Sequence, residues 1–221
     1  MKFKTQSTRK AFEEIAESWY RVRHWSRFSK ELKRLSLRWQ QGKLLNIGCA
    51  HGPDFLPFKE NKFDLYGIDF SKEMIRLAKK YSSKFDFNVN LAMADAVHLP
   101  FSNATFDWVI AIATYHHIEG RVRRQEAFKE LKRVLKPDGE AFITVWNRWQ
   151  PRFWFKGKEI EVPWKLKDVT LYRYYYLFSY IELQKELKKA GFHVITMLTE
   201  SYSWPTSFFS SNICALVSGG D

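Results

Sequence analysis

The fold is decided by the segment Lys43-Leu44-Leu45-Asn46-Ile47-Gly48-Cys49-Ala50-His51-Gly52. Its first half is a short apolar run, which is typical of a buried strand. Small residues follow where the chain leaves that strand, and they let a ligand come close to the backbone. The N–H groups of such a loop are free to bind a carboxylate. The segment therefore predicts a strand followed by a ligand-binding loop.

Strands and helices alternate on both sides of this segment. Apolar side chains at helical spacing predict helices over 7–20 and 26–40. Further strands are expected at 65–68, 88–94, 106–113, 140–145, 192–199 and 213–217, and further helices over 71–81, 121–135 and 179–190. This alternation predicts an α/β fold, Rossmann-like and doubly wound, with a mostly parallel seven-stranded sheet. Ligands in such sheets bind beyond the carboxyl ends of the strands.

A single domain in four parts is expected from these 221 residues. Residues 1–42 form an N-terminal helical extension on the substrate side, and 43–146 form the cofactor-binding core. Residues 147–178 are rich in aromatic and basic side chains with little periodicity, and we expect a substrate-recognition insertion there. Residues 179–221 supply a closing helix and strands.

The net charge of +12 is confined to two segments. Residues 1–42 hold eleven basic and four acidic side chains, and residues 147–190 hold ten and five. The remainder is neutral. A polyanionic partner would benefit from this separation through electrostatic steering and counterion release, although a basic surface also serves solubility.

Several classes of protein are excluded by composition. No apolar run approaches the roughly 20 residues that span a bilayer, and the N-terminus lacks the apolar stretch of a signal peptide. Cys49 and Cys214 are too few for a zinc site or a disulfide framework. We expect both thiols to be free, no metal site, and a cytoplasmic location.

Two carboxylates follow later strands at the positions that a nucleoside cofactor needs. Asp69 lies 21 residues after Gly48, where an acid accepts the ribose hydroxyls. Asp95 follows the third core strand, where it can accept from an adenine amino group, with the Ala96 N–H beside it. The glycines are four apart, so the G-x-G-x-x-G fingerprint of NAD sites is missed.

This spacing resembles the class I S-adenosylmethionine methyltransferases, whose motif is acid-x-G-x-G-x-G. The resemblance covers 43–146 and includes the turn Leu135-Lys136-Pro137-Asp138-Gly139. It departs from the motif at two positions, with Asn46 for the acid and Ala50 for the middle glycine. It implies S-adenosylmethionine as cofactor, S-adenosylhomocysteine as product, and the cofactor-binding residues Asn46, Gly48, Ala50, Gly52, Asp69, Asp95, Ala96 and Ile112.

Segments outside the core narrow the resemblance further. They are Phe12-Glu13-Glu14-Ile15-Ala16, Arg23-x-Trp25, Tyr115-His116-His117, Val145-Trp146, Val162-Pro163-Trp164, Arg173-Tyr174-Tyr175-Tyr176-Leu177-Phe178, Glu182-Leu183 and Ala190-Gly191-Phe192. Together they resemble the tRNA wobble-uridine methyltransferases, which convert 5-carboxymethyluridine in the anticodon to its methyl ester. Tyr176 departs from that family, which usually has His, and 202–212 is divergent.

A carboxylate acceptor sets the roles expected of the site residues. It is ionised at neutral pH and needs no general base, so the main task is alignment. We expect Arg23, with His116 and Arg173, to position it. Only one of His116 and His117 should face the site, since side chains alternate on extended backbone. Trp25, Trp164, Tyr174 and Tyr175 are expected to bind the base, because aromatics mixed with cations suit splayed anticodon bases.

The resemblance also implies a small zinc-binding activator protein as partner. The segment Asn88–Met93 is expected at the sheet edge, where an uncharged strand invites strand addition. Two other functions stay open. One is a small-molecule methyltransferase of the same fold, and the other is a catalytically inert RNA-binding scaffold, which Asn46 and Ala50 motivate.

Overall fold

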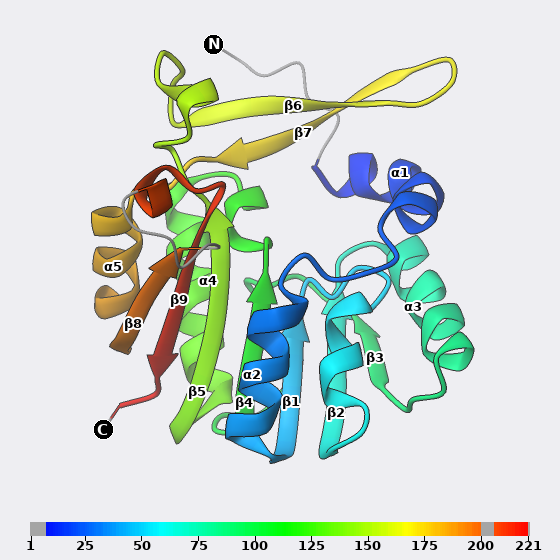
Figure 1. Cartoon of the computed structure of the whole chain (residues 1–221), viewed down its shortest axis with the longest axis vertical. Coiled ribbons are helices and arrows are strands. Elements are labelled where there is room, and N and C mark those ends of the chain that lie inside the picture. Colours follow the sequence, from blue (N-terminus) through cyan, green and yellow to red (C-terminus); the bar gives the residue numbers. More distant parts are fainter. Residues whose placement is uncertain (1–7, 200–205, 221) are drawn as a thin grey trace.

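The computed structural model describes residues 8–199 and 206–220 and contains one large mixed sheet. Its strand order is β3-β2-β1-β4-β5-β9-β8, and only β9 runs antiparallel to its neighbours (Figure 1). The strands are β1 (Gln41–Ile47), β2 (Lys62–Asp69), β3 (Asn90–Met93), β4 (Phe106–Ile112), β5 (Leu135–Trp146), β8 (His193–Thr199) and β9 (Asn212–Ser218). The predicted seven-stranded doubly wound sheet is confirmed.

Five α-helices are present in the described residues. They are α1 (Thr8–Val22), α2 (Ser29–Trp39), α3 (Lys72–Lys84), α4 (Arg121–Val134) and α5 (Tyr180–Lys189). Short 3-10 helices lie at η1 (Pro53–Phe58), η2 (Tyr115–His117), η3 (Pro151–Phe153) and η4 (Thr206–Phe209). Ser71 caps α3 by accepting a hydrogen bond from the Met74 N–H, as its position predicts.

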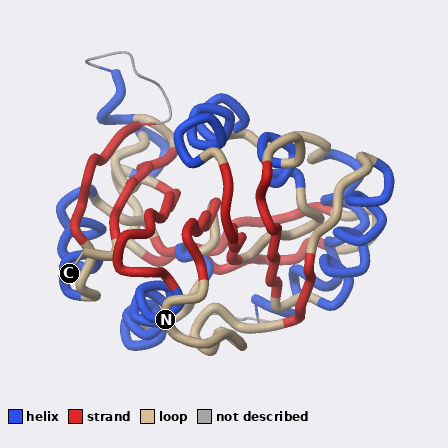
Figure 2. The backbone as a smooth tube through the Cα atoms, turned by 90° about the horizontal axis from the view of Figure 1, so that it is seen from below, coloured by secondary structure: helices blue, strands red, loops and turns tan. Residues whose placement is uncertain are grey.

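The two faces of the sheet carry separate cores because side chains alternate along each strand. In β1, Leu45 and Ile47 enter the core that α4 and α5 cover, whereas Leu44 enters the core beneath α2. Burying such a side chain contributes about 1.5–3 kcal/mol. Apolar residues at nearly every strand position therefore hold helices on both sides of the sheet (Figure 2).

Helix α1 lies over the carboxyl end of the sheet instead of on a face. Its apolar stripe, including Phe12, Ile15 and Tyr20, packs against Met74 and Leu77 of α3. The same cluster includes Leu171 and thus joins α1 to the segment after β5. Within the N-terminal extension, α1 therefore lies above the strand ends near the predicted ligand site, whereas α2 packs on a face of the sheet (Figure 1).

The insertion after β5 forms a β-hairpin, which its weak periodicity did not predict. Strands β6 (Glu159–Lys165) and β7 (Thr170–Tyr176) pair antiparallel, with Val162 opposite Arg173. The aromatic run in β7 has high strand propensity. Alternation along it directs Arg173 and Tyr175 to one face and Tyr174 to the other. The hairpin crosses above the sheet, where it roofs the strand ends (Figure 1).

Candidate cofactor and substrate site

A cavity of about 930 Å³ opens beyond the carboxyl ends of β1, β2, β3 and β4. Its floor includes Gly48, Asp69, Asp95 and Ile112, and its roof comes from α1 and β7. Ligand pockets in proteins measure about 300–1,000 Å³. This cavity is at the upper end of that range, and it can hold a nucleoside cofactor together with a second ligand.

The loop after β1 is held against the neighbouring strands at Gly48. The N–H groups of Gly48 and Cys49 both donate to the Ile68 carbonyl at 2.8 Å. Gly48 has a φ of +72°, and a Cβ there would overlap the side chain of Thr114. The glycine is therefore required both by its backbone conformation and by the close approach of β4.

Two of the four predicted loop residues do not reach the cavity. Gly48 and Ala50 line it, whereas Gly52 packs against Phe55. Asn46 is fully buried below the floor, and neither polar atom of its amide has a hydrogen-bond partner. Asn46 and Gly52 thus lie outside the cavity lining, and their direct contact with the cofactor stays a prediction.

Asp54, which no sequence motif indicates, lines the cavity beside this loop. Its side chain is 8% exposed, and burial raises its pKa to about 6, although the neighbouring Ser26 and Asn46 side chains lower it. The Asn46 amide lies beside the carboxylate, but neither of its polar atoms has a hydrogen-bond partner. The only sequence signal was an acid directly after the Gly52-Pro53 turn.

Asp69 lies where the spacing predicts, at the end of β2 and on the cavity wall. One carboxylate oxygen accepts from the Ala50 N–H at 2.9 Å and the other from the Ser71 N–H at 2.9 Å. Burial raises its pKa to about 6, so Asp69 is mostly ionised at neutral pH. Each oxygen keeps a lone pair for a hydroxyl donor.

The next wall of the cavity is formed by Asp95, Ala96 and Ile112. Asp95 accepts from the Val97 N–H at 3.1 Å and pairs with Arg123 at 2.8 Å. This ion pair is largely exposed, so it contributes little to stability. A carboxylate beside a backbone N–H and an apolar side chain is suited to hold an adenine ring.

Both adjacent histidines line the cavity, so the expectation that only one does is wrong. The alternation argument fails because β4 ends at Ile112, and residues 115–117 form a 3-10 turn. The His116 Nδ1 accepts from the Trp146 N–H at 3.1 Å, which leaves the proton of the neutral ring on an unpartnered Nε2. The His117 Nδ1 lies 3.0 Å from the Tyr174 carbonyl and must donate to it.

The two histidines are neutral at physiological pH. Burial, His117 and Arg173 hold the pKa of His116 well below its usual range. Burial lowers the pKa of His117 to about 3, against the hydrogen bond to Tyr174. They therefore offer hydrogen-bonding groups to a ligand but no positive charge.

Arg173 is the main cation of the cavity roof. It is 5% exposed and lies over the rings of Trp19, Trp164 and Tyr175, with centroid distances of 5.6, 5.0 and 5.4 Å. Its Nη1 donates to the Tyr175 hydroxyl at 3.0 Å, and its Nε has no partner. No described carboxylate forms an ion pair with it, which is unusual for a buried arginine.

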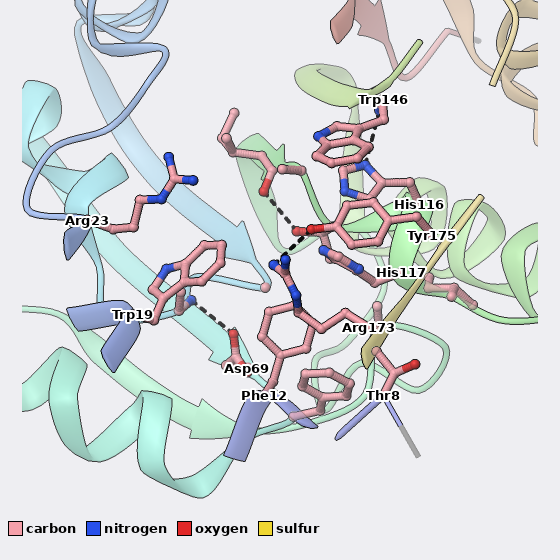
Figure 3. A pocket seen from close by; sticks show the side chains of 18 of the residues that line it. Thr8, Phe12, Trp19, Arg23, Asp69, His116, His117, Trp146, Arg173 and Tyr175 are labelled. Atoms are coloured by element: carbon pink, nitrogen blue, oxygen red, sulfur yellow. Dashed lines mark hydrogen bonds between the residues drawn. The ribbon is translucent and has the colours of Figure 1, made fainter. Parts of the chain in front are cut away.

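Figure 3 shows how the roof and walls converge. Tyr175, His116 and Trp146 gather at one side, with Tyr175 and His116 stacked at 5.0 Å. Arg23 and Trp19 lie at the other side, and the Arg173 guanidinium is between them. Arg23 is exposed and stacks on Trp19 at 5.3 Å. Burial, and then the positive charge of Arg23, lower the pKa of Arg173.

The predicted base-binding residues divide into three groups. Tyr175 and Trp164 line the cavity, and Trp164 packs against Trp19 of α1. Trp25 also lines it but is 67% exposed, at the rim against Phe85. Tyr174, which was expected to bind the base, does not line the cavity. It is fully buried in the main core, where its hydroxyl accepts a hydrogen bond from Arg124 at 3.1 Å.

Three more side chains lie elsewhere than the sequence suggests, one through alternation along β7 and two through the position of α1. Tyr176 faces away from the cavity and bonds to Glu182, so its difference from the resembled family does not alter the cavity wall. Trp19 was expected only as part of an apolar helix face and Phe12 as part of that face and of a family motif, yet both line the cavity. Their role depends on α1 lying over the strand ends, which helical periodicity does not reveal.

Comparison with known proteins assigns the central part of the chain. Residues 45–143 match a family model described as a methyltransferase domain. A Schizosaccharomyces pombe protein named tRNA (carboxymethyluridine(34)-5-O)-methyltransferase is 24% identical over 92% of this chain and 96% of its own length. A Bos taurus protein named probable tRNA methyltransferase 9B is 31% identical over 72% of this chain, which spans only 32% of that protein.

Solved structures share the fold at lower identity. An S-adenosylmethionine-dependent methyltransferase of Clostridium acetobutylicum has a TM-score of 0.74 at 15% identity, covering 96% of this chain and 99% of its own. A methyltransferase of Haloferax volcanii, solved as a complex with a methyltransferase activator, has a TM-score of 0.70 at 17% identity, covering 97% and 98%. These likenesses show a common architecture.

The role of Gly48 can be tested against a second glycine of positive φ. Gly120 has a φ of +84°, and nothing within 4 Å would meet a Cβ there. We expect Gly120→Ala to lower the free energy of unfolding by about 1–3 kcal/mol from backbone strain alone, because its φ of +84° and ψ of 136° suit glycine. Gly48→Ala should lower it by about 1–3 kcal/mol more, through overlap with Thr114, and should also weaken S-adenosylhomocysteine binding. Thermal denaturation and calorimetric titration measure both effects; equal behaviour of the two variants would contradict the assignment.

Proposed function

We propose that this chain, a class I S-adenosylmethionine-dependent methyltransferase by its matched domain and fold, methyl-esterifies the carboxylate of 5-carboxymethyluridine at the tRNA wobble position. The observation that carries the proposal is Arg173, a buried cation without a carboxylate partner among the described residues, facing a cavity large enough for two ligands. A substrate carboxylate would supply the missing negative charge. The Schizosaccharomyces pombe relative is named for this activity.

The residues of the cavity fit the cofactor. The backbone at Gly48 lines the cavity, and carboxylates lie at the tips of β2 and β3. Asp69 would accept from the ribose hydroxyls and Asp95 from the adenine amino group, with Ala96 and Ile112 beside the ring. When bound, S-adenosylmethionine supplies the methyl group on a sulfonium. The cavity also weighs against an inert scaffold, which would have no need of it.

Methylation of a carboxylate asks for alignment instead of proton transfer. The acceptor has a reference pKa of about 4 and is ionised at neutral pH, so His116 and His117 need not act as bases. Because both histidines are neutral, Arg173 is the principal positive charge that would contact the acceptor carboxylate. Arg23 supplies a second positive charge nearer the mouth of the cavity. Correct positioning of acceptor and donor can lower the barrier by about 7–11 kcal/mol. The surrounding rings limit hydration of the carboxylate.

Charge and aromatic rings around the mouth support an RNA substrate. Arg9, Arg27, Arg123 and Arg152 join Arg23 on the cavity wall. Outside the cavity lining, exposed rings gather on η3, which carries Arg152, on η4 and on their flanks: Trp149, Trp154, Phe155, Phe208 and Phe209. Unpaired bases of an anticodon loop stack on such rings, while the cations contact phosphates. We propose that 1–42 and 147–178 form this substrate side of a single domain.

A methyltransferase activator protein is proposed as partner, docking on β3. This strand is the edge of the sheet, as the segment Asn88–Met93 predicts. The Ala94 N–H donates to the Asp69 carbonyl, so by alternation the peptide groups of Ala92 face β2 and those of Leu91 and Met93 face outward. These groups are available for strand addition. The structural relative from Haloferax volcanii was solved with such an activator.

No helix in residues 8–199 and 206–220 has the length and apolar character to cross a membrane. With tRNA as substrate, we propose that the protein acts in the cytoplasm.

The proposed reaction is tested by nucleoside mass spectrometry of bulk tRNA from cells with and without this chain. We expect the methyl ester at the wobble uridine to disappear and its free carboxylate to accumulate. Purified chain with its activator should restore the ester on that tRNA. An unchanged nucleoside profile, with methyl transfer to a metabolite, would favour the small-molecule alternative.

The role of Arg173 is tested by Arg173→Met, which keeps a long side chain but removes the charge. We expect kcat on tRNA to fall about 100-fold because the acceptor is no longer held in line, whereas S-adenosylhomocysteine affinity stays within twofold. Arg121→Met is the matched control, since Arg121 is an exposed arginine outside the cavity. Parallel loss of cofactor affinity and stability in Arg173→Met would show that Arg173 is only structural.

Docking of the activator is tested by hydrogen exchange of the β3 amides. Addition of the activator should protect the outward amides of Leu91 and Met93, while the Ala92 amide, already bonded to β2, changes little. We also expect the chain expressed alone to be poorly soluble or weakly active. Full activity of the isolated chain, or protection confined to another surface, would argue against this partner.

A further inference from the structure

Asp54 carries a negative charge that no residue of the described chain neutralises. It is 8% exposed, lines the cavity, and forms no ion pair with any Lys, Arg or His in residues 8–199 and 206–220. The side chains of Ser26 and Asn46 lie against it. Burying a carboxylate without a cation costs several kcal/mol, so such a group points to a cationic ligand.

The adjacent Asn46 shows that the usual negative charge is missing from the β1 loop. It occupies the motif position at which the resembled methyltransferases carry an acid, yet it is neutral and fully buried. Both polar atoms of its amide are unpartnered. The loop thus lacks its usual negative charge at 46 and has one instead at 54, on the cavity side of the same turn.

The order of the strands decides which part of the cofactor meets Asp54. Along the sheet, β3, β2, β1 and β4 follow one another, and their tips carry Asp95, Asp69, Gly48 and Ile112 in that order. With the adenine at Asp95 and the ribose at Asp69, the amino-acid portion of the cofactor extends toward the loop after β1. Asp54 belongs to the wall at that end, together with Gly48 and Ala50.

We propose that Asp54, with the side chain of Ser26 against it, binds the ammonium group of the cofactor's amino-acid portion. The ammonium donates to the carboxylate and supplies the counter-charge that the chain itself does not. The hydrogen bond is charge-assisted and lies in a site of low exposure, where such bonds are strongest. This inference rests on the proposed function only in taking S-adenosylmethionine as cofactor.

Two product-like ligands separate this contact from the rest of the site. S-adenosylhomocysteine contains the amino-acid portion, whereas 5′-methylthioadenosine keeps the adenine, ribose and sulfur but lacks it. We expect Asp54→Asn to weaken S-adenosylhomocysteine binding about 10- to 100-fold, as for loss of a hydrogen bond between charged groups, and to leave 5′-methylthioadenosine within twofold. Calorimetric titration measures both affinities without any need for methyl transfer.

Asp69→Asn is the matched control because it makes the same chemical change at the ribose. It should weaken both ligands by similar factors, since both contain the ribose. Thermal denaturation checks that each variant is folded; if Asp54→Asn is not, Asp54→Glu replaces it, and a selective change in S-adenosylhomocysteine affinity alone is then expected.

The outcomes distinguish this inference from the proposed function. If the unaltered chain binds neither ligand, the cofactor assignment itself is wrong. If it binds both, and Asp54→Asn weakens both equally or neither, the cofactor assignment stands, but Asp54 does not bind the ammonium group. Selective loss of S-adenosylhomocysteine affinity supports it.

Discussion

The contact of Gly48 with Thr114 is the constraint on which the site depends. The Thr114 hydroxyl donates to the Ile47 carbonyl at 2.8 Å, so the last residue of β1 and the residue after β4 are held together. Only glycine leaves room for this approach. The loop after β1 is thereby held close to the end of β4, and the chain after β4 continues directly into η2. His116 and His117 lie on that turn, and both line the cavity.

The cavity is electrically polarised by two buried groups of opposite sign. In the part of the chain that the structure describes, Arg173 in the cavity roof has no carboxylate as ion-pair partner, and Asp54 in the cavity wall has no cation as ion-pair partner. Buried charges of this kind lower stability unless something binds them. A cofactor with an ammonium group and a substrate with a carboxylate satisfy both. The two buried charges thus lower the stability of the unliganded protein and make the cavity complementary in charge to its ligands.

The neutral histidines follow from the same arrangement. A positive charge on either ring would lie beside Arg173 in a desolvated space, and this holds both pKa values low. Their hydrogen bonds to Trp146 and Tyr174 define one tautomer for each ring. His116 thus offers a donor and His117 an acceptor to the cavity. In this site histidine orients ligands, and the proton transfer for which it is best known is not required.

The sequence by itself determined what lies along single strands and at their tips. Apolar runs predicted the sheet, and Gly48, Asp69 and Asp95 were located by spacing, since the carboxyl ends of parallel strands meet at one edge. Tertiary structure decided the walls and roof. Trp19 became a cavity residue because α1 crosses the strand ends, and Tyr174 left the cavity because alternation along β7 turns it into the main core. Asp54 lines the cavity because η1 begins there, directly after the β1 loop. Such placements depend on contacts between distant segments, which local periodicity does not encode.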